Sequence, residues 1–169
     1  VQWEGLRVPF QVYPGVIIPP GSYRSPYLAG MYNTDRRKWI SVQASNAIGG
    51  FLSGNQVSWS GTVNVRQGSR LTSALRWTRN DVTLPQGAFV TNLGSLRVGY
   101  NFTTLVNLQA LIQYNDRTQR WTTNLRFNWQ RDAATGLYVV YNDTESLNGL
   151  GPVNRAFIIK YTHLFDVLK

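Results

Sequence analysis

The chain of 169 residues contains no cysteine, one histidine and one methionine. Without cysteine it can form no disulfide, no thiolate zinc site and no thiol nucleophile. Long apolar runs are absent too, since no stretch approaches the ~20 apolar residues that a membrane-spanning helix needs. We find no amphipathic helix, no glycine-rich phosphate loop and no EF-hand loop. These absences argue against a helical membrane protein and against the commonest cofactor and metal sites, and we expect neither a cofactor nor a metal.

Charge is scarce and one-sided. Charged residues make up 15% of the chain, against about 25% in typical globular proteins. The 17 Lys and Arg outnumber the eight Asp and Glu, which gives a formal net charge of +9. Such an excess favours an anionic partner, with nucleic acid, lipopolysaccharide and small anions as candidates, unless it serves solubility alone. With 43% hydrophobic residues the chain is not of the disordered class, and its length predicts one domain over residues 1–169.

The clearest pattern is a two-residue alternation from Trp121 to Gln130. Side chains in a strand point alternately to opposite faces, so this segment predicts a strand with one apolar, aromatic-ended face and one polar face. The apolar face carries Trp121, Thr123, Leu125, Phe127 and Trp129, and the polar face carries Thr122, Asn124, Arg126, Asn128 and Gln130. In a soluble sheet the apolar face is the core, whereas in a membrane barrel it is the outside and the polar face lines the lumen.

Similar segments and turn signals recur every ten to fifteen residues, which is typical of an all-β barrel or sandwich. We therefore predict an all-β fold, an antiparallel transmembrane up-and-down β-barrel of about 8–10 strands. An even number of strands would place both termini at the periplasmic end. The expected strands are 4–12, 22–33, 39–48, 56–66, 70–79, 89–102, 105–115, 120–131, 136–142 and 155–165.

The connections between these segments alternate in length. Short polar ones at 33–38, 67–69, 103–104 and 132–135 separate longer ones at 13–21, 49–55, 80–88, 116–119 and 143–154. Outer-membrane barrels have short periplasmic turns at one end and longer loops at the other, so this alternation favours such a barrel. The segment Pro14–Pro20 is expected to be a stiff outer loop, because proline donates no ladder hydrogen bond.

The strand ends predict two aromatic belts at the membrane interfaces, where Trp and Tyr are favoured. From Trp121 to Trp129 is eight residues; at ~3.3 Å per residue and a tilt of ~40° this spans about 20 Å, close to the ~25 Å apolar band of known barrels. The alternative is that the aromatic side chains form the core of a soluble barrel. The periplasmic belt would hold Trp39, Tyr100, Phe102, Trp129 and Phe165, and the outer belt Trp59, Trp77, Tyr114, Trp121 and Phe157.

The polar face carries cations without acids in the expected strands. Rings of Arg or Lys favour anions in pores, so we predict a water-containing lumen with anion preference. The alternative is a lumen plugged by its own side chains, because barrels of this size are narrow. The candidate lumen-lining cations are Arg66, Arg76, Arg97, Arg126 and Lys160.

Catalytic signals are weak. His163, the only histidine, falls on the aromatic face of the last expected strand, away from any Ser and acid with which it could form a triad. The run Arg36–Lys38 is too short to favour nucleic acid. Asp143 and Glu145 form at most a weak calcium site, because their spacing matches no standard loop. We therefore expect no enzyme and no nucleic-acid partner.

Five segments carry a family resemblance: YPGVIIPPGSY (13–23), NDVTLPQGAF (80–89), LQALIQYNDRTQRWTTNLRFNWQ (108–130), GLYVVYND (136–143) and NRAFIIKYTHLF (154–165). Together they resemble the C-terminal barrel of an uncharacterised bacterial outer-membrane family. Members of that family carry an N-terminal β-sandwich similar to family 9 carbohydrate-binding modules. The resemblance implies an outer-membrane β-barrel without an established activity, so it brings no catalytic residues.

This sequence departs from the family pattern in three ways. The sandwich is not in it, it matches only the last portion of the larger barrel, and four residues follow Phe165. Either the chain closes alone as a small barrel, or further strands come from another chain. Its start at Val1, with no signal peptide, fits a processed mature chain or a fragment equally well.

The expected function is that of a non-enzymatic barrel in the bacterial outer membrane, either a small anion-favouring channel or a structural subunit of an envelope assembly. Its expected partners are the lipid bilayer, lipopolysaccharide, small anions and other envelope protein chains. The alternatives are a soluble β-barrel that binds an apolar ligand, and a barrel-embedded hydrolase.

Overall fold

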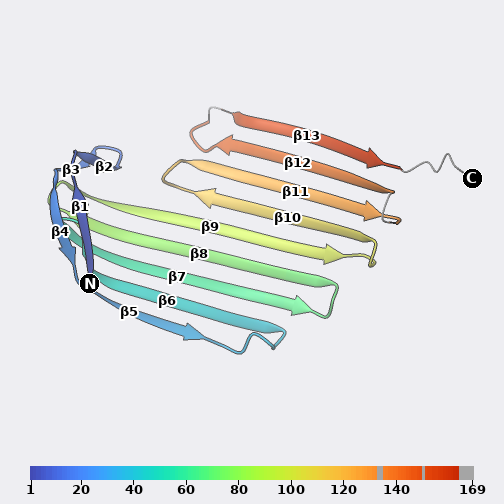
Figure 1. Ribbon diagram of the computed structural model, residues 1–169, viewed down its shortest axis with the longest axis horizontal. Coiled ribbons are helices and arrows are strands. Elements are labelled where there is room, and N and C mark those ends of the chain that lie inside the picture. The colour runs from blue at the N-terminus through green and yellow to red at the C-terminus, as the bar shows by residue number, and fades with distance from the viewer. Residues whose placement is uncertain (133–134, 150, 164–169) are drawn as a thin grey trace, which may run out of the picture.

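A computed structural model describes residues 1–132, 135–149 and 151–163. Its main feature is one nine-stranded antiparallel sheet in which every strand pairs with its neighbours in sequence. Figure 1 shows these strands side by side in a single layer. The all-β antiparallel prediction is confirmed. The strands are β5 (Tyr27–Asn33), β6 (Ile40–Phe51), β7 (Gly54–Gln67), β8 (Leu71–Leu84), β9 (Gly87–Asn101), β10 (Val106–Asn115), β11 (Arg120–Gln130), β12 (Gly136–Ser146) and β13 (Pro152–Thr162).

The first 25 residues form two hairpins outside this sheet. β1 (Gln2–Leu6) pairs with β4 (Gly21–Ser25), and β2 (Phe10–Tyr13) pairs with β3 (Val16–Ile18). We call β1–β4 the N-terminal hairpins. They lie at one end of the large sheet, at the left of Figure 1. We call this end the hairpin end and the opposite one the distal end.

The N-terminal hairpins overturn two sequence predictions. Residues 4–12 are not one barrel strand but parts of β1 and β2, and the expected outer loop Pro14–Pro20 contains β3. Its prolines flank β3 rather than interrupt it, which the missing N–H of proline permits. The expected strand 22–33 is also divided, because Pro26 lies between β4 and β5.

The structure also corrects the lengths of the connections. At the hairpin end, the expected loops 49–55 and 80–88 shrink to the turns 52–53 and 85–86, because β6, β7, β8 and β9 extend past their predicted ends. At the distal end, 34–39 is longer than either turn. The predicted contrast between short and long connections is therefore wrong as a rule for this sheet.

The conventional core of the described residues is small. Val12, Val16 and Ile18 of the N-terminal hairpins are buried against Leu52 and against Val82 and Leu84 of β8. Tyr13 stacks on Phe89 of β9, with ring centroids 4.5 Å apart. These contacts seat the N-terminal hairpins on one face of the sheet at the hairpin end.

The two outermost strands of the sheet are β5 and β13. No described strand pairs with the outer side of either, so the sheet as described is open. The sheet also has nine strands, where the sequence prediction favoured an even number.

Candidate functional site

The pairing register places the five candidate lumen cations on one face. Arg66 lies opposite Thr72, Arg76 opposite Ser95, and Arg97 opposite both Ala74 and Leu111. Directly opposed residues in an antiparallel pair share a face. Arg126 opposes Gln109 and Val140, and Lys160 opposes Tyr138, which continues the same face to β13. We call this the polar face, and its role as a lumen wall stays a prediction.

Hydroxyl and amide side chains link neighbouring strands across the polar face. Gln56 donates to Ser58 at 2.5 Å, Ser58 donates to the Asn80 Oδ1 at 2.6 Å, and Asn80 donates to Thr91 at 3.1 Å. Ser60 and Thr78 share a hydrogen bond of 3.1 Å. These side chains are neutral, so they supply no counter-charge to the cations on the same face.

Carboxylates are missing from the polar face of the described strands. Extension of β8 and β12 brings Asp81, Asp143 and Glu145 into strands, although the sequence analysis assigned them to loops. The register puts all three on the opposite face, since Asp81 opposes Val57 and Val90, Asp143 opposes Thr123, and Glu145 opposes Trp121. The segregation of charge that the sequence predicted therefore holds in the longer strands.

Several hollows open on the polar face, and two of them are lined by more than one cation. The first, of about 270 Å³, is lined from β6 to β9 and by the β5–β6 connection. Its charged lining residues are Arg36, Lys38, Arg66 and Arg97. The second, of about 660 Å³, is lined from β8 to β12 and includes Arg76 and Arg120. Arg126 and Lys160 line neither of these hollows.

Arg36, Lys38 and Arg120 are functional candidates that the sequence analysis missed. Arg36 and Lys38 lie in a turn and Arg120 is the first residue of β11. Arg120 falls in the expected strand 120–131 on the parity of Arg126, so alternation could have placed it on the polar face. Arg36 and Lys38 lie outside every expected strand, where alternation assigns no face. Their lateral neighbours in the sheet, which are set by pairing, would have been needed.

The opposite face carries the candidate belt aromatic residues, and we call it the apolar face. Trp77 stacks on Tyr114 with centroids 5.9 Å apart, and Tyr114 contacts Trp121 at 5.1 Å. Trp77 also covers Gly94, where an added Cβ would come within 2.9 Å of the indole ring. The outer-belt residues of three strands thus form one cluster, and glycine makes room for it.

The remaining belt candidates are more scattered. Tyr100 meets Phe102 edge-on at 4.8 Å, while Trp39 is exposed in the β5–β6 connection. Trp59 and Phe157 are exposed on the apolar face, and Trp129 opposes Val106 and Leu137 on the same face. Phe165 lies outside the described residues, so its place in a belt stays a prediction.

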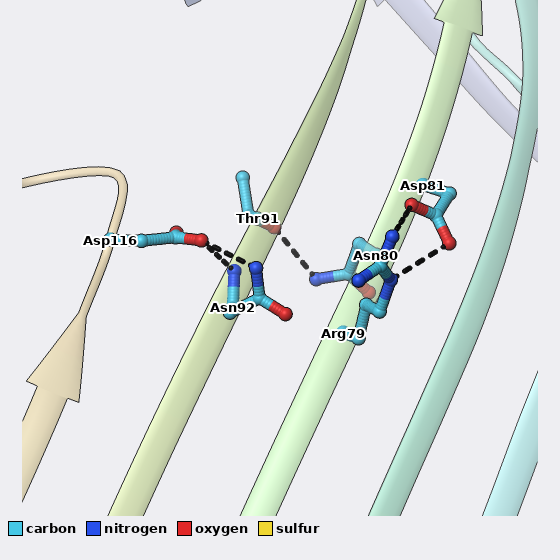
Figure 2. Close-up of polar contacts among 6 residues, drawn as sticks. All are labelled: Arg79, Asn80, Asp81, Thr91, Asn92 and Asp116. Carbon is cyan, nitrogen blue, oxygen red and sulfur yellow. Dashed lines mark hydrogen bonds and ion pairs between the residues drawn. The ribbon is translucent and has the colours of Figure 1, made fainter.

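Beyond the aromatic cluster, the hairpin end of the apolar face becomes polar. Figure 2 shows Arg79 on Asp81, with a closest separation of 3.0 Å, and Asp116 accepting from the backbone and side chain of Asn92 at 2.7 and 2.6 Å. On β13, Arg155 contacts Asp143 at 3.0 Å and Glu145 at 3.4 Å, level with the aromatic cluster, because Glu145 lies opposite Trp121 and Asp143 opposite Thr123. On β8 and β9 the apolar face thus carries an ion pair and amide contacts between the aromatic cluster and the hairpin end.

Two sequence candidates concern metal binding and catalysis, namely the pair Asp143 and Glu145, and His163. Asp143 and Glu145 contact Arg155, and the described residues include no group of three or more His, Cys, Asp or Glu that could hold a metal. His163 Nδ1 lies 3.1 Å from the hydroxyl of Thr135, and its ring stacks on Tyr161.

No family model, curated protein or solved structure matches this chain. In the described part of the chain, no helix is long and apolar enough to cross a membrane.

Proposed function

We propose that the nine-stranded sheet is the wall of an outer-membrane β-barrel whose cationic polar face lines an anion-favouring channel. The observation that carries this proposal is the two-sided character of the sheet. The N-terminal hairpins and both hollows lie on the polar face, whereas large aromatic and aliphatic side chains on the apolar face are uncovered. An uncovered apolar surface of this extent marks an interaction site with protein or membrane.

Two further features support a membrane as the cover. The aromatic cluster of Trp77, Tyr114 and Trp121 has the amphipathic rings favoured at membrane interfaces. Past it, the apolar face of β8 carries the ion pair of Arg79 with Asp81, as a surface entering the headgroup region would. A barrel wall in lipid also requires β5 and β13 to be paired, because unpaired backbone groups are costly in a bilayer.

The polar face supports anion preference. The six cations that the strands of the large sheet carry on this face, Arg120 among them, oppose no carboxylate of that sheet, so dissolved anions would supply the counter-charge. The N-terminal hairpins narrow the hairpin end of this face without covering the first hollow, which none of their residues lines. Because polar side chains line most of both hollows, we favour the channel over the soluble barrel that would bind an apolar ligand.

The experiment is single-channel recording of the detergent-refolded chain in a planar bilayer under a salt gradient. We expect discrete steps and a reversal potential directed toward anions. Replacing Arg97 and Arg126 by Gln should reduce the anion preference, and replacing both by Glu should reverse it. The matched control replaces Arg79 and Arg155 by Gln, which removes two positive charges from the apolar face and should leave the reversal potential in place.

An unchanged reversal potential in the Arg97→Glu, Arg126→Glu variant would contradict the anion-lumen assignment. Silence from a chain shown to be folded and inserted would overturn the channel and leave a structural barrel subunit. A chain that is soluble and monomeric without detergent, and that does not enter liposomes, would overturn the membrane assignment itself.

A further inference from the structure

The first hollow on the polar face differs from the rest of the sheet in its concentration of positive charge. Arg66 comes from β7, Arg97 from β9, and Arg36 and Lys38 from the β5–β6 connection, and all four line the same space of about 270 Å³. No acidic residue lines it. Residues distant in sequence are thus brought together by the pairing of β6 to β9.

Small side chains create the space between these cations. Ala74 lies between Asn64 and Arg97 in one row across the strands, and Thr72 lies opposite Arg66 in the next row. Ser41 is buried at the edge of the hollow, where it accepts a hydrogen bond from the Asn64 Nδ2 at 3.4 Å. The lining therefore combines small side chains, Ser41, Thr72 and Ala74 among them, with four long cationic ones.

In the part of the chain that the structure describes, none of the four cations Arg36, Lys38, Arg66 and Arg97 is paired with a carboxylate. The acid nearest to them in sequence is Asp35, whose Oδ1 accepts a hydrogen bond from the backbone N–H of Arg37 at 2.9 Å. Four like charges around one hollow repel one another unless a bound anion compensates them.

We propose that this hollow binds a multivalent oxyanion, phosphate or diphosphate, either free or as the terminal group of a larger ligand. Arginine forks match the geometry of phosphate oxygens, and lysine adds a point charge. The volume lies just below the ~300–1,000 Å³ of typical small-molecule pockets, which suits a compact anion. The inference deepens the proposed function, since it names the class of anion that the polar face would retain.

The test is calorimetric titration of the folded chain in detergent with inorganic phosphate and diphosphate, in a buffer free of multivalent anions. Chloride and nitrate serve as monovalent comparisons. We expect diphosphate to bind more tightly than phosphate, and both at least tenfold more tightly than chloride. The Arg66→Gln, Arg97→Gln variant should weaken diphosphate binding at least tenfold. The matched control, Arg126→Gln with Lys160→Gln, removes the same charge from the same face outside the hollow and should weaken binding less than threefold.

Equal weakening by the two variants would overturn the site, because it would show only the general field of the polar face. Equal affinity for nitrate and diphosphate would overturn it too. If the Arg66, Arg97 variant does not fold, the turn variant Lys38→Gln replaces it, with an expected loss of at least threefold. A refolded chain that forms no channel but still binds diphosphate would refute the proposed function and keep this site, whereas an anion-selective channel without diphosphate preference would do the reverse.

Discussion

Strand β8 has large apolar residues on both of its faces, and they are buried on one face and more exposed on the other. Val82 and Leu84, on the polar face, are 4% and 6% exposed under the N-terminal hairpins, whereas Leu75 and Trp77, on the apolar face, are 52% and 48% exposed. The chain therefore supplies its own cover for the one apolar patch of the polar face at the hairpin end. For the larger apolar surface on the other side it supplies none, which indicates that a different medium or molecule covers that surface.

The largest effect is expected from destabilising the N-terminal hairpins, which cover Val82 and Leu84. Ile18 is 0% exposed in the small core, so Ile18→Ala should destabilise the N-terminal hairpins by about 2–5 kcal/mol. Hydrogen exchange of β2 and β3 would measure the loss, and protease sensitivity before β5 should rise with it. Ile17→Ala is the control, because Ile17 is 54% exposed and its truncation should change little. Equal effects at the two positions would mean that the hairpins are not held by this core.

The second test places an arginine on each face of the sheet and compares the two costs. Leu125, on the apolar face, and Leu93, on the polar face, are similarly exposed at 37% and 43%. If lipid covers the apolar face, Leu125→Arg should lower the free energy of unfolding in liposomes by about 2–4 kcal/mol, because the residue lies midway between the belts. Leu93→Arg should lower the free energy of unfolding much less, because residue 93 would then face water in the lumen. Equal costs in liposome unfolding titrations would contradict the assignment of the faces.

The smallest expected effect comes from comparing two tryptophans of the apolar face, Trp77 and Trp59. Trp77→Ala removes the stack on Tyr114 and should cost about 0.5–1.5 kcal/mol beyond the lost burial. Trp59→Ala is the control, because Trp59 is similarly exposed but lies outside the Trp77, Tyr114 and Trp121 cluster. The two variants can be compared by tryptophan fluorescence during liposome unfolding. A larger loss at Trp59 would show that the cluster is not an anchoring unit.

Much of the large sheet could be predicted from the sequence because alternation is a local signal. The segments 105–115 and 120–131 match β10 and β11 closely, and the cations were assigned to one face by parity alone. Alternation failed where distant contacts decide. β8 continues to Leu84 because Val82 and Leu84 meet Ile18, and nothing near them in sequence reveals that contact.

The candidate site was predictable only in part, for a related reason. Parity gave the face of Arg66 and Arg97, but the hollow that they share with Arg36 and Lys38 depends on which strands pair and on the small side chains between them. A turn has no parity, so the basic run Arg36–Lys38 was predicted only as part of the short connection 33–38 and was assigned to neither face. Lateral register, which local pattern does not encode, brings these charges together.

The number of strands in the sheet has a consequence for closure. Successive strands of the meander reverse direction, so the first and last of nine, β5 and β13, run the same way. Joining them directly would create one parallel seam in an otherwise antiparallel wall, as odd-numbered barrels require. A wall that is antiparallel throughout would instead need an odd number of additional strands between these two edges. Each added strand would also widen the barrel, so the number of strands that closes the wall would also set the diameter of the proposed lumen.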